Sequence, residues 1–466
     1  MILELTRDLV KELSKIEIPE DIKKAVALQV ENLKLSAEIG KRKLKFSEEK
    51  ADKIGIKPPL LQILINSSAS MLYDWDDYLF AGHTGHSAVF TALALGEEFK
   101  IPEEKIKRAI FIGNEIGGRF GILTLIGPLN GQMMTYLHGI ISATITEYLT
   151  GKIENIPKRI CSYISNPHFI HFEGFMGGET KLFTASFPIV QGVISSLFDV
   201  KENQYSEEGF VRIFSWNDFS EDTIKAIFSP DFFLTRTLMI KKYPGCAYVL
   251  PQIECTLKIK RKIEENFEKF DIDCIREIEV EYSIIPALLD VISSRYLDFS
   301  SHIPAQFSTY GAVALALYGQ NFTPETYEKV RSHKNSILKI ISKIKTKHNT
   351  KYTRKILEKV SDSFPFLYGE KPPSVKNILK AISHSQIKIS HLVKEGIFII
   401  PALIARRTKT ERKIKDEFKF IFPAKVKIQY KDLLLEEEAI SHSAPAISED
   451  AEKNIQEKRE IASKKV

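Results

Sequence analysis

Apolar positions recur at helical spacing through the first half of the chain. The segments AVFTALALGEEF (88–99), IKRAIFIGNEIGGRF (106–120) and YLHGIISATITEYL (136–149) are amphipathic or wholly apolar, which predicts helices. The last two also carry glycine, alanine, serine or threonine, small residues that let buried helices approach closely. We therefore expect a tightly packed helical bundle up to about residue 250.

The pattern changes in the second half of the chain. The segments EIEVEY (277–282) and AKVKIQY (424–430) alternate polar and apolar residues with a period of two, which predicts strands. A helical segment, PAQFSTYGAVALALYG (304–319), lies between them. Residues from about 256 to 440 are therefore expected to form a separate α+β unit. After Pro445 the pattern returns to helix.

Length and composition restrict the class of protein. At 466 residues, with 44% hydrophobic and 27% charged content, the chain is long enough for two domains of unequal size. Charges interrupt the apolar positions of the N-terminus, so it lacks the apolar core of a signal peptide. No apolar run reaches membrane-spanning length, and the four cysteines show no pattern of a secreted disulfide scaffold. These features predict a cytoplasmic protein that does not enter a membrane.

The formal net charge of +6 is unevenly distributed, because residues 329–357 contain many lysines and arginines and no acid. Such a stretch could bind nucleic acid or an acidic partner. Within it, SILKIISKIKTK (336–347) mixes apolar and basic residues in a helical pattern and offers few aromatic rings for base stacking. We therefore expect a solvated helical face and no nucleic-acid partner.

A dense group of ionisable residues precedes the helix predicted at 88–99. Such neighbours shift one another's pKa values and suit acid–base chemistry at neutral pH. Alternatively, the aspartates cap the helix and the histidines make ordinary hydrogen bonds. Histidine and aspartate also bind metals, but without zinc-type spacing we expect no metal. The group spans thirteen residues: Asp74, Asp76, Asp77, His83 and His86.

Four other segments follow along the chain: GGETKLFTASFPIVQGV (177–193), KKYPGC (241–246), AQFS (305–308) and PAKVKI (423–428). Together with DWDD, the histidine after it and LALGEE, these segments resemble the landmarks of the MmgE/PrpD family. That family includes 2-methylcitrate dehydratase, cis-aconitate decarboxylase and iminodisuccinate epimerase. The landmarks span nearly the whole chain in the family's order, so the resemblance depends on their combination.

The resemblance implies a mainly α fold. A large all-helical domain would comprise residues 1–255 and 441–466, and a smaller α+β lid domain, residues 256–440, would be inserted before the last helix. The change of period along the chain agrees with this plan. The resemblance also implies a homodimer, a site between helical domain and lid, no metal or other cofactor, and small di- or tricarboxylate substrates.

Dehydration of a hydroxy-tricarboxylate needs a base for the proton α to a carboxylate, an acid for the leaving hydroxyl, and cations that hold the carboxylates. By resemblance, Asp74 and His83 match the family's acid–base positions. Lys181 and Lys241 match its lysines, and Cys246 stands where the family has Cys or His. The alternatives are that each lysine reaches water and that the cysteine is a small buried apolar residue.

Further positions are candidates for binding the substrate. Tyr78 replaces a threonine that is common in the family, and His86 remains an alternative to His83 as the acid–base group. Where many members have a second catalytic histidine, this chain has GPLNGQMMTYLHG. Its Asn130 and Gln132 amides can orient a carboxylate but do not transfer protons at neutral pH. The substrate-binding candidates are Asp77, Tyr78, His86, Asn130, Gln132 and Tyr243.

The expected activity is that of a cofactor-independent lyase, specifically a hydro-lyase such as 2-methylcitrate dehydratase of propionate metabolism. A related decarboxylase, or an epimerase or isomerase of a dicarboxylate, is the alternative within the family. An alternative of another class is a non-catalytic helical scaffold that binds an acidic partner through the basic face of residues 329–357.

Overall fold

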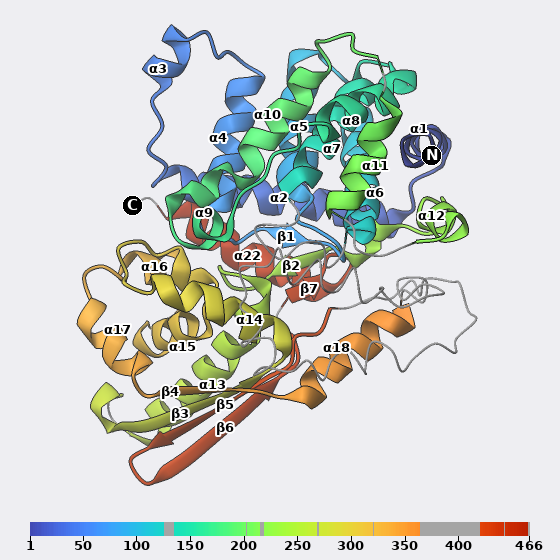
Figure 1. The fold of residues 1–466 in the computed structure, drawn as a ribbon. Coiled ribbons are helices and arrows are strands. Elements are labelled where there is room, and N and C mark those ends of the chain that lie inside the picture. The colour runs from blue at the N-terminus through green and yellow to red at the C-terminus, as the bar shows by residue number, and fades with distance from the viewer. Residues whose placement is uncertain are drawn as a thin grey trace.

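A computed structural model gives the arrangement of the chain in two parts (Figure 1). A bundle of helices comes mainly from the first half of the chain, and an α+β part comes from the second half. The prediction of a mainly α protein with a smaller α+β part is confirmed. The structure describes residues 1–124, 135–201, 203–214, 219–267, 270–319, 321–363, 420–441 and 443–464.

The helical part surrounds one buried helix. Every residue of α7 (Thr135–Leu149) is buried, and α5, α6, α8 and α10 pack around it. Within the described ranges, none of the helices is both long and apolar enough to cross a lipid bilayer. The other helices of this part are α1 (Ile2–Lys15), α2 (Glu20–Lys41), α3 (Glu48–Lys53), α4 (Leu60–Met71), α5 (Gly85–Glu98), α6 (Glu103–Leu123), α8 (Ile156–Ile164), α9 (Phe172–Met176), α10 (Phe183–Ser195), α11 (Gln204–Phe214) and α12 (Glu221–Ile227).

Small residues set the distance between α7 and α10. A Cβ atom added to Gly192 of α10 would lie 2.2 Å from the carbonyl oxygen of Gly139 and 2.1 Å from Oγ of Ser142. The Ser142 hydroxyl also donates a hydrogen bond to the Ile189 carbonyl, at 2.9 Å. The two helices therefore touch almost backbone to backbone, and the expectation that small residues serve close packing is confirmed.

The α+β part is built on a sheet with strand order β4-β3-β5-β6. Strands β3 and β4 are parallel, whereas β5 is antiparallel to both of its neighbours. The apolar sides of β3 and β5 are buried, and α13 packs on β5 and β6. Both predicted strands are therefore found. The elements are β3 (Ile275–Tyr282), β4 (Ile344–His348), β5 (Ala424–Tyr430), β6 (Leu433–Ala439), α13 (Leu250–Asn266), α14 (Ile284–Ser293), α15 (Thr309–Tyr318), α16 (Pro324–Glu328), α17 (Lys334–Ile341) and α18 (Thr350–Ser363).

The helical pattern predicted over 336–347 was only partly right. Helix α17 ends at Ile341, and the following residues form β4. The sequence IKTKH of β4 alternates with a period of two, and parallel pairing with β3 supplies its backbone hydrogen bonds. Pairing with β3 therefore determines the secondary structure of a segment whose own pattern fits both helix and strand.

A second, small sheet was not predicted, so the helical part is not all-helical. Its strands β1 (Asp77–Tyr78), β2 (Met239–Lys241) and β7 (Ser443–Pro445) are antiparallel, in the order β1-β2-β7. Strands this short carry no readable alternation. The last helix, α22 (Glu449–Ser463), packs against β2, β7 and α2 at the junction between the two parts (Figure 1).

Candidate functional site

The loop after α4 carries the first candidate residue in an unusual conformation. Asp74 has a φ of +52°, a left-handed conformation that non-glycine residues rarely adopt without support. The Gly245 amide donates to the carbonyls of Tyr73 and Asp74, at 3.0 and 3.3 Å. Lys241 Nζ donates to the same Asp74 carbonyl, at 2.8 Å. The KKYPGC segment therefore holds this loop in place.

Asp74 pairs with both predicted lysines. Its Oδ1 lies 3.0 Å from Lys181 Nζ, and its Oδ2 lies 3.2 Å from Lys241 Nζ. Lys241 Nζ also lies 2.5 Å from Oδ1 of Asp76. Neither lysine has any exposed surface. Residues far apart in the sequence thus meet in one buried cluster, formed by Asp74, Asp76, Lys181 and Lys241, which we call the Asp–Lys cluster.

The position of β2 explains why Lys241, and not Lys242, enters the cluster. Lys241 is the last residue of β2, which is paired on both sides. Because successive side chains of a strand point to opposite faces, Lys242 points outward, where its Nζ lies 3.3 Å from the Glu254 carboxylate.

Lys181 depends on a residue to which the sequence assigned no role. Its Nζ donates to the Met71 carbonyl and to Oε1 of Gln306, both at 2.8 Å. The Gln306 amide group in turn donates to the Leu72 carbonyl, at 2.7 Å. Gln306 lies in the AQFS segment, so this landmark serves to fix the lysine. The sequence contains the AQFS motif, but only the fold shows that its glutamine contacts Lys181.

The charges of the Asp–Lys cluster balance. Burial alone would raise the pKa of Asp74, but Lys181 and Lys241 outweigh it and hold the pKa below its ordinary value. Burial acts in the same direction on Asp76, and there Lys241 and His83 hold the pKa well below its ordinary value. Each ammonium group donates to three protein oxygen atoms, which uses all its protons. A ligand carboxylate can therefore reach either lysine only by displacing one of these oxygens.

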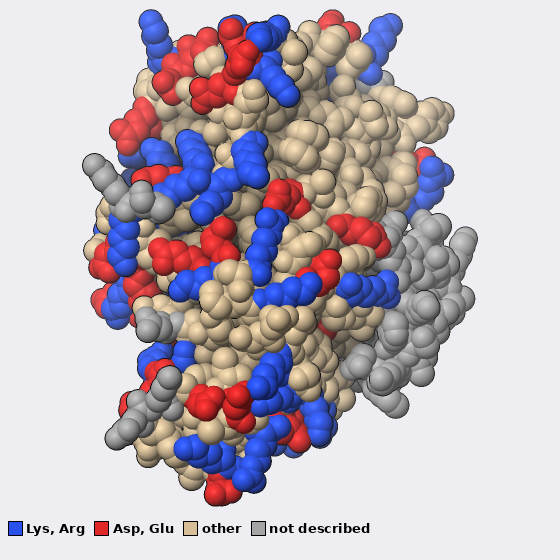
Figure 2. All heavy atoms as spheres, turned by 90° about the vertical axis from the view of Figure 1, so that its left-hand side faces the viewer, with Lys and Arg blue, Asp and Glu red and all other residues tan. Residues whose placement is uncertain are grey.

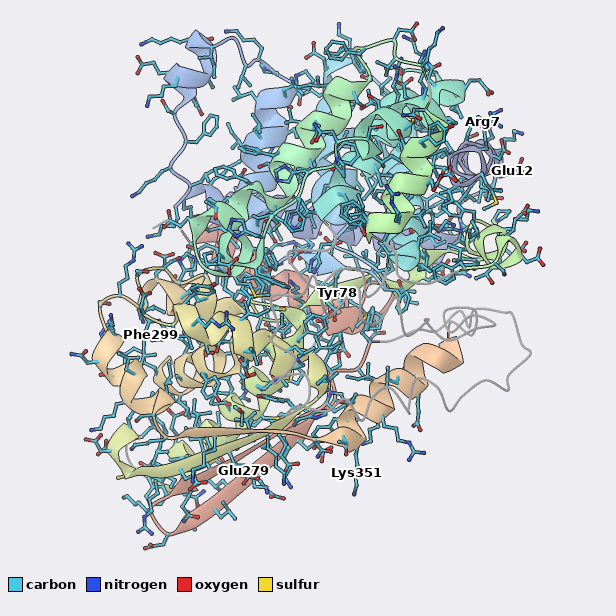
Figure 3. All side chains as sticks on the ribbon, in the orientation of Figure 1. Arg7, Glu12, Tyr78, Glu279, Phe299 and Lys351 are labelled. Carbon is cyan, nitrogen blue, oxygen red and sulfur yellow. The ribbon has the colours of Figure 1, made fainter. Side chains whose placement is uncertain are left out.

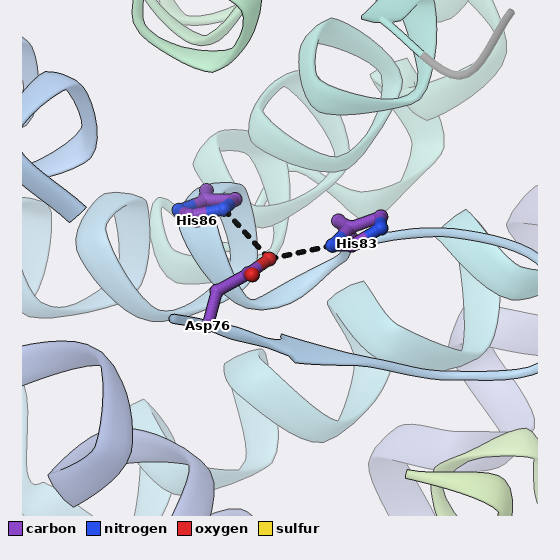
Figure 4. A group of neighbouring side chains, drawn as sticks. All are labelled: Asp76, His83 and His86. Carbon is purple, nitrogen blue, oxygen red and sulfur yellow. Dashed lines mark hydrogen bonds and ion pairs between the residues drawn. The ribbon is translucent and has the colours of Figure 1, made fainter. Parts of the chain in front are cut away.

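Two histidines share the second oxygen of Asp76 (Figure 4). His83 Nδ1 lies 2.5 Å and His86 Nε2 lies 3.0 Å from Oδ2 of Asp76. The other ring nitrogen of His86 is bonded to Ser70 Oγ, at 2.7 Å. The side chain of His86 is 1% exposed, whereas that of His83 is 34% exposed.

These contacts distinguish the two histidines chemically. Both ring nitrogens of His86 are engaged, so it acts as a fixed part of the site. Among the described residues, Nε2 of His83 has no hydrogen-bond partner. A carboxylate on one nitrogen orients an imidazole and stabilises its protonated form, which leaves the other nitrogen to exchange a proton. The geometry therefore favours His83 over His86 as the acid–base group.

The same three side chains could hold a metal ion. One ligand atom each from Asp76, His83 and His86 lies within 4.8 Å of the others, and this ligand set suits zinc. However, the Lys241 ammonium lies 2.5 Å from the other oxygen of Asp76, and a dication would add to this positive charge. The hydrogen bonds of the group fit proton transfer better.

Asp77 faces away from the lysines. Its Oδ2 accepts a hydrogen bond from Gln29 Nε2, at 2.8 Å, and a Cβ atom on Gly85 would lie 2.4 Å from its Oδ1. Burial, and then the charge of Asp76, raise the pKa of Asp77 to about 6. The carboxylate therefore lies between α2 and the first residue of α5, the helix that carries His86.

The other candidates lie around the cluster at different depths. The Tyr78 ring, at the junction of the two parts (Figure 3), lies 6.0 Å from the His83 ring. The Tyr243 hydroxyl donates to Glu254 on α13 and not to the Asp–Lys cluster. Burial, and then Asp74, raise the pKa of the Cys246 thiol to about 12, which keeps the thiol protonated. This favours the alternative that Cys246 is a small buried apolar residue.

Asn130 and Gln132 lie outside the described residues. Helix α7 brings His138, to which the sequence analysis assigned no role, close to the site. Its Nδ1 lies 3.1 Å from Ser87 Oγ, and its ring meets the His86 ring edge-on at 6.0 Å. Burial, and then the neighbouring histidines, lower its pKa well below the ordinary value, so it stays neutral. The helical pattern predicted its helix but not which residue it faces.

Comparison with known proteins supports the assignment. The family model of the MmgE/PrpD C-terminal domain matches residues 243–368, a range that includes β3, α15 and Gln306. This match supports membership of the chain in the MmgE/PrpD family. Members of the MmgE/PrpD family are generally enzymes, dehydratases and related proteins, which suggests a function of the dehydratase or lyase type. No curated protein matches the chain.

Residues 329–357 do not form one helical face. They run through α17, β4 and the start of α18. Several of their charges are paired, as in Lys345 with Glu277 at 2.9 Å and Arg331 with Glu179 at 3.7 Å. On the side of the molecule drawn in Figure 2, basic and acidic side chains are interspersed.

Proposed function

We propose that this protein is a cofactor-independent hydro-lyase that acts on a small di- or tricarboxylate, with 2-methylcitrate as the first substrate to test. The proposed reaction would be a step of propionate metabolism, and the proposed location of the protein is the cytoplasm. The observation that carries the proposal is the pairing of His83 with Asp76, a carboxylate that also contacts the buried Lys241 ammonium. Within the described ranges, Nε2 of His83 has no hydrogen-bond partner. A proton acceptor next to cations suits abstraction of a proton α to a carboxylate.

In the proposed reaction, His83 serves as both base and acid. Its Nε2 takes the proton from the carbon α to a carboxylate, and the electron pair of the C–H bond moves into that carboxylate as an enolate. Asp76 stabilises the imidazolium at Nδ1. The electron pair then forms the carbon–carbon double bond as the C–O bond breaks. The leaving hydroxide takes the proton back from Nε2 and departs as water, so hydrogen and hydroxyl leave from the same face.

The two lysines would stabilise the enolate. Preorganised ammonium groups in a buried site act strongly on developing negative charge. Asp74 forms ion pairs with both lysines. The proposal therefore requires the substrate carboxylate to replace an Asp74 oxygen as the partner of Lys181 or Lys241.

Turnover assays test the proposal. Purified protein is incubated with 2-methylcitrate, citrate, cis-aconitate and iminodisuccinate, and products are followed by proton NMR. We expect an unsaturated product from a hydroxy-tricarboxylate, and His83→Ala should lower kcat by about 10²–10⁴-fold. His171→Ala, at an exposed position, is the matched control and should retain the rate. Failure of the unmodified protein to convert any of these acids contradicts the proposal.

A decarboxylase or an epimerase of a dicarboxylate is the second candidate. The same proton chemistry at His83 serves all three reactions, since each passes through an enolate-like carbanion. The products separate them: release of carbon dioxide from cis-aconitate indicates decarboxylation, and exchange of the α proton of iminodisuccinate with inversion indicates epimerisation.

The proposal includes a homodimer, supported by exposed apolar side chains on α10 and directly after its C-terminal end. Phe187, Leu197 and Phe198 are 45%, 75% and 60% exposed. Exposed apolar side chains of this size are common in protein–protein contacts. We assign a second copy of the chain to this surface.

A further inference from the structure

A buried lysine of the last helix lies behind the site. Lys458 of α22 has no exposed surface. Its Nζ donates hydrogen bonds to Asn32 Oδ1 at 2.5 Å, to Ser36 Oγ at 3.2 Å and to the Trp75 carbonyl. Among the described residues, no carboxylate forms an ion pair with it. All three of its protons therefore go to uncharged oxygen atoms.

The Trp75 carbonyl is the link to the site, because it lies between Asp74 and Asp76 in the chain. It accepts a second hydrogen bond from Ser36 Oγ, at 2.6 Å. The Lys458 ammonium also lies 4.6 Å from the Trp75 ring centre, within range of a cation–π interaction. Two donors and a ring contact thus fix the peptide group between Trp75 and Asp76.

The same helix also holds the strand that carries the second lysine of the Asp–Lys cluster. Asn454 Nδ2, one turn before Lys458, donates to the Ile240 carbonyl at 3.2 Å. Ile240 directly precedes Lys241 in β2. Helix α22 therefore contacts the backbone of two of the three segments whose side chains meet in the cluster.

We propose that Lys458 is a positioning residue of the active site. Its ammonium group binds the Trp75 carbonyl and thereby orients the side chains of Asp74 and Asp76. The orientation of Asp76 in turn sets its hydrogen bond with His83. The inference rests on the proposed function for its kinetic consequence, but not for its structural one. A buried ammonium is costly to desolvate, and apolar side chains would fill the same space, so its presence requires a role beyond packing.

The charge of Lys458 responds to pH in the physiological range. Burial lowers its pKa to about 7. Asp76 and Asp77 favour the ammonium form, and Lys241 opposes it, whereas α2 contributes the neutral Asn32 and Ser36.

Fluorescence tests the contact without any substrate. The chain contains two tryptophans, Trp75 and Trp216, so Trp216→Phe leaves Trp75 as the only reporter. In this background, we expect Lys458→Met to shift the emission maximum of Trp75 at pH 6. Lys464→Met, at an exposed position of the same terminal segment, should leave it unchanged. Identical emission spectra with and without the Lys458 ammonium overturn the proposal.

Kinetics test the consequence for the reaction. We expect Lys458→Met to lower kcat by about 10- to 100-fold with little change in KM, the pattern of lost positioning rather than lost binding. Lys464→Met should retain both values. If Lys458→Met does not fold, Ser36→Ala provides a milder test, because it removes one donor to the Trp75 carbonyl and one acceptor of Lys458. It should lower kcat in the same direction.

Failure of the positioning role can be distinguished from failure of the proposed function. A folded Lys458→Met protein with the kcat of the unmodified enzyme overturns the positioning role, and so does a change in KM alone. If the unmodified protein converts no polycarboxylate, the proposed function fails, and the emission of Trp75 alone decides whether Lys458 holds its carbonyl.

Discussion

Each oxygen of Asp74 faces a different ammonium group, and this divided pairing allows two lysines to be buried side by side. Like charges this close repel strongly at low dielectric. Here Asp74 lies between them, and Asp76 adds a second carboxylate on Lys241. The aspartate is therefore as much a structural counter-ion as a candidate for chemistry.

Removing that counter-ion should destabilise the fold. Asp74→Asn removes the carboxylate charge that Lys181 and Lys241 share, and loss of a buried partner typically costs about 3–5 kcal/mol. Urea unfolding at pH 7 measures the change. The control is Asp199→Asn, which removes an exposed ion pair with Lys158 and should have no measurable effect. A loss at Asp74 as small as that of the control contradicts the buried pairing.

Asp77 predicts a pH dependence of the opposite sign to that of Asp74. Its folded pKa of about 6 lies above the unfolded value of about 3.9, so the folded state binds the proton more tightly. The stability it contributes is present below pH 4 and is lost as the pH rises through 6. Asp77→Asn should therefore raise the free energy of unfolding at pH 8 by up to about 3 kcal/mol, and much less at pH 4. Paired urea titrations at both pH values measure this, and an equal effect at both contradicts it.

Motifs identified Asp74, Lys181 and Lys241 as partners, although more than 160 residues separate the first from the last. The sequence did not show that Asp76 rather than Asp74 bonds His83. That choice depends on the left-handed turn at Asp74 and on the side of β2 from which Lys241 emerges, and neither is encoded in composition or spacing. The sequence analysis assigned no role to Gln306 or Lys458 for a related reason: their roles arise from contacts with backbone carbonyls.

At the level of elements, long periodic segments were predictable and short ones were not. Helices α5, α6 and α7 and strands β3 and β5 each carry enough residues for a period to be read. Strands β1, β2 and β7 have two or three residues each, and their pairing depends wholly on partners distant in the sequence. Segment 344–348 shows the intermediate case, because its pattern is ambiguous and its neighbour β3 resolves it.

The crossing of α7 and α10 should be sensitive to a single methyl group. Gly192→Ala would bring a Cβ atom within 2.2 Å of the Gly139 carbonyl oxygen, so one helix must move, at a cost of about 1–3 kcal/mol. Gly209 of α11 is the matched control, because no atom lies within 4 Å of a Cβ added there. Gly209→Ala should be neutral or stabilise by up to about 1 kcal/mol. Thermal unfolding of both variants measures the difference, and equal melting temperatures contradict the close crossing.

At the scale of the whole molecule, the small sheet β1-β2-β7 joins three distant stretches of chain. It lies between the helical bundle and the α+β part (Figure 1), directly beside the Asp–Lys cluster. Gln306 extends from the α+β part to Lys181 of the helical part. A relative movement of the two parts would therefore alter the hydrogen bonds of the cluster.

The proposed dimer is tested at the exposed end of α10. Replacing Leu197 and Phe198 together by glutamate places charge on a surface that should be buried between two copies, so the mass measured by sedimentation equilibrium should fall from that of two chains to that of one. Ile54→Glu, at an equally exposed apolar residue outside this surface, should leave the dimer intact. A monomeric unmodified protein contradicts the assignment.

The contacts of α22 also set an order of events during synthesis. Residues 2–41 and the loop with Asp74 leave the ribosome early, but the lysine that supports that loop lies in the helix Glu449–Ser463. A nascent chain can therefore assemble its helical bundle long before it has a complete proton-transfer site. Translation products that stop short of this helix would lack the contacts of α22 with Trp75 and β2, so we expect them to be less active than the full chain.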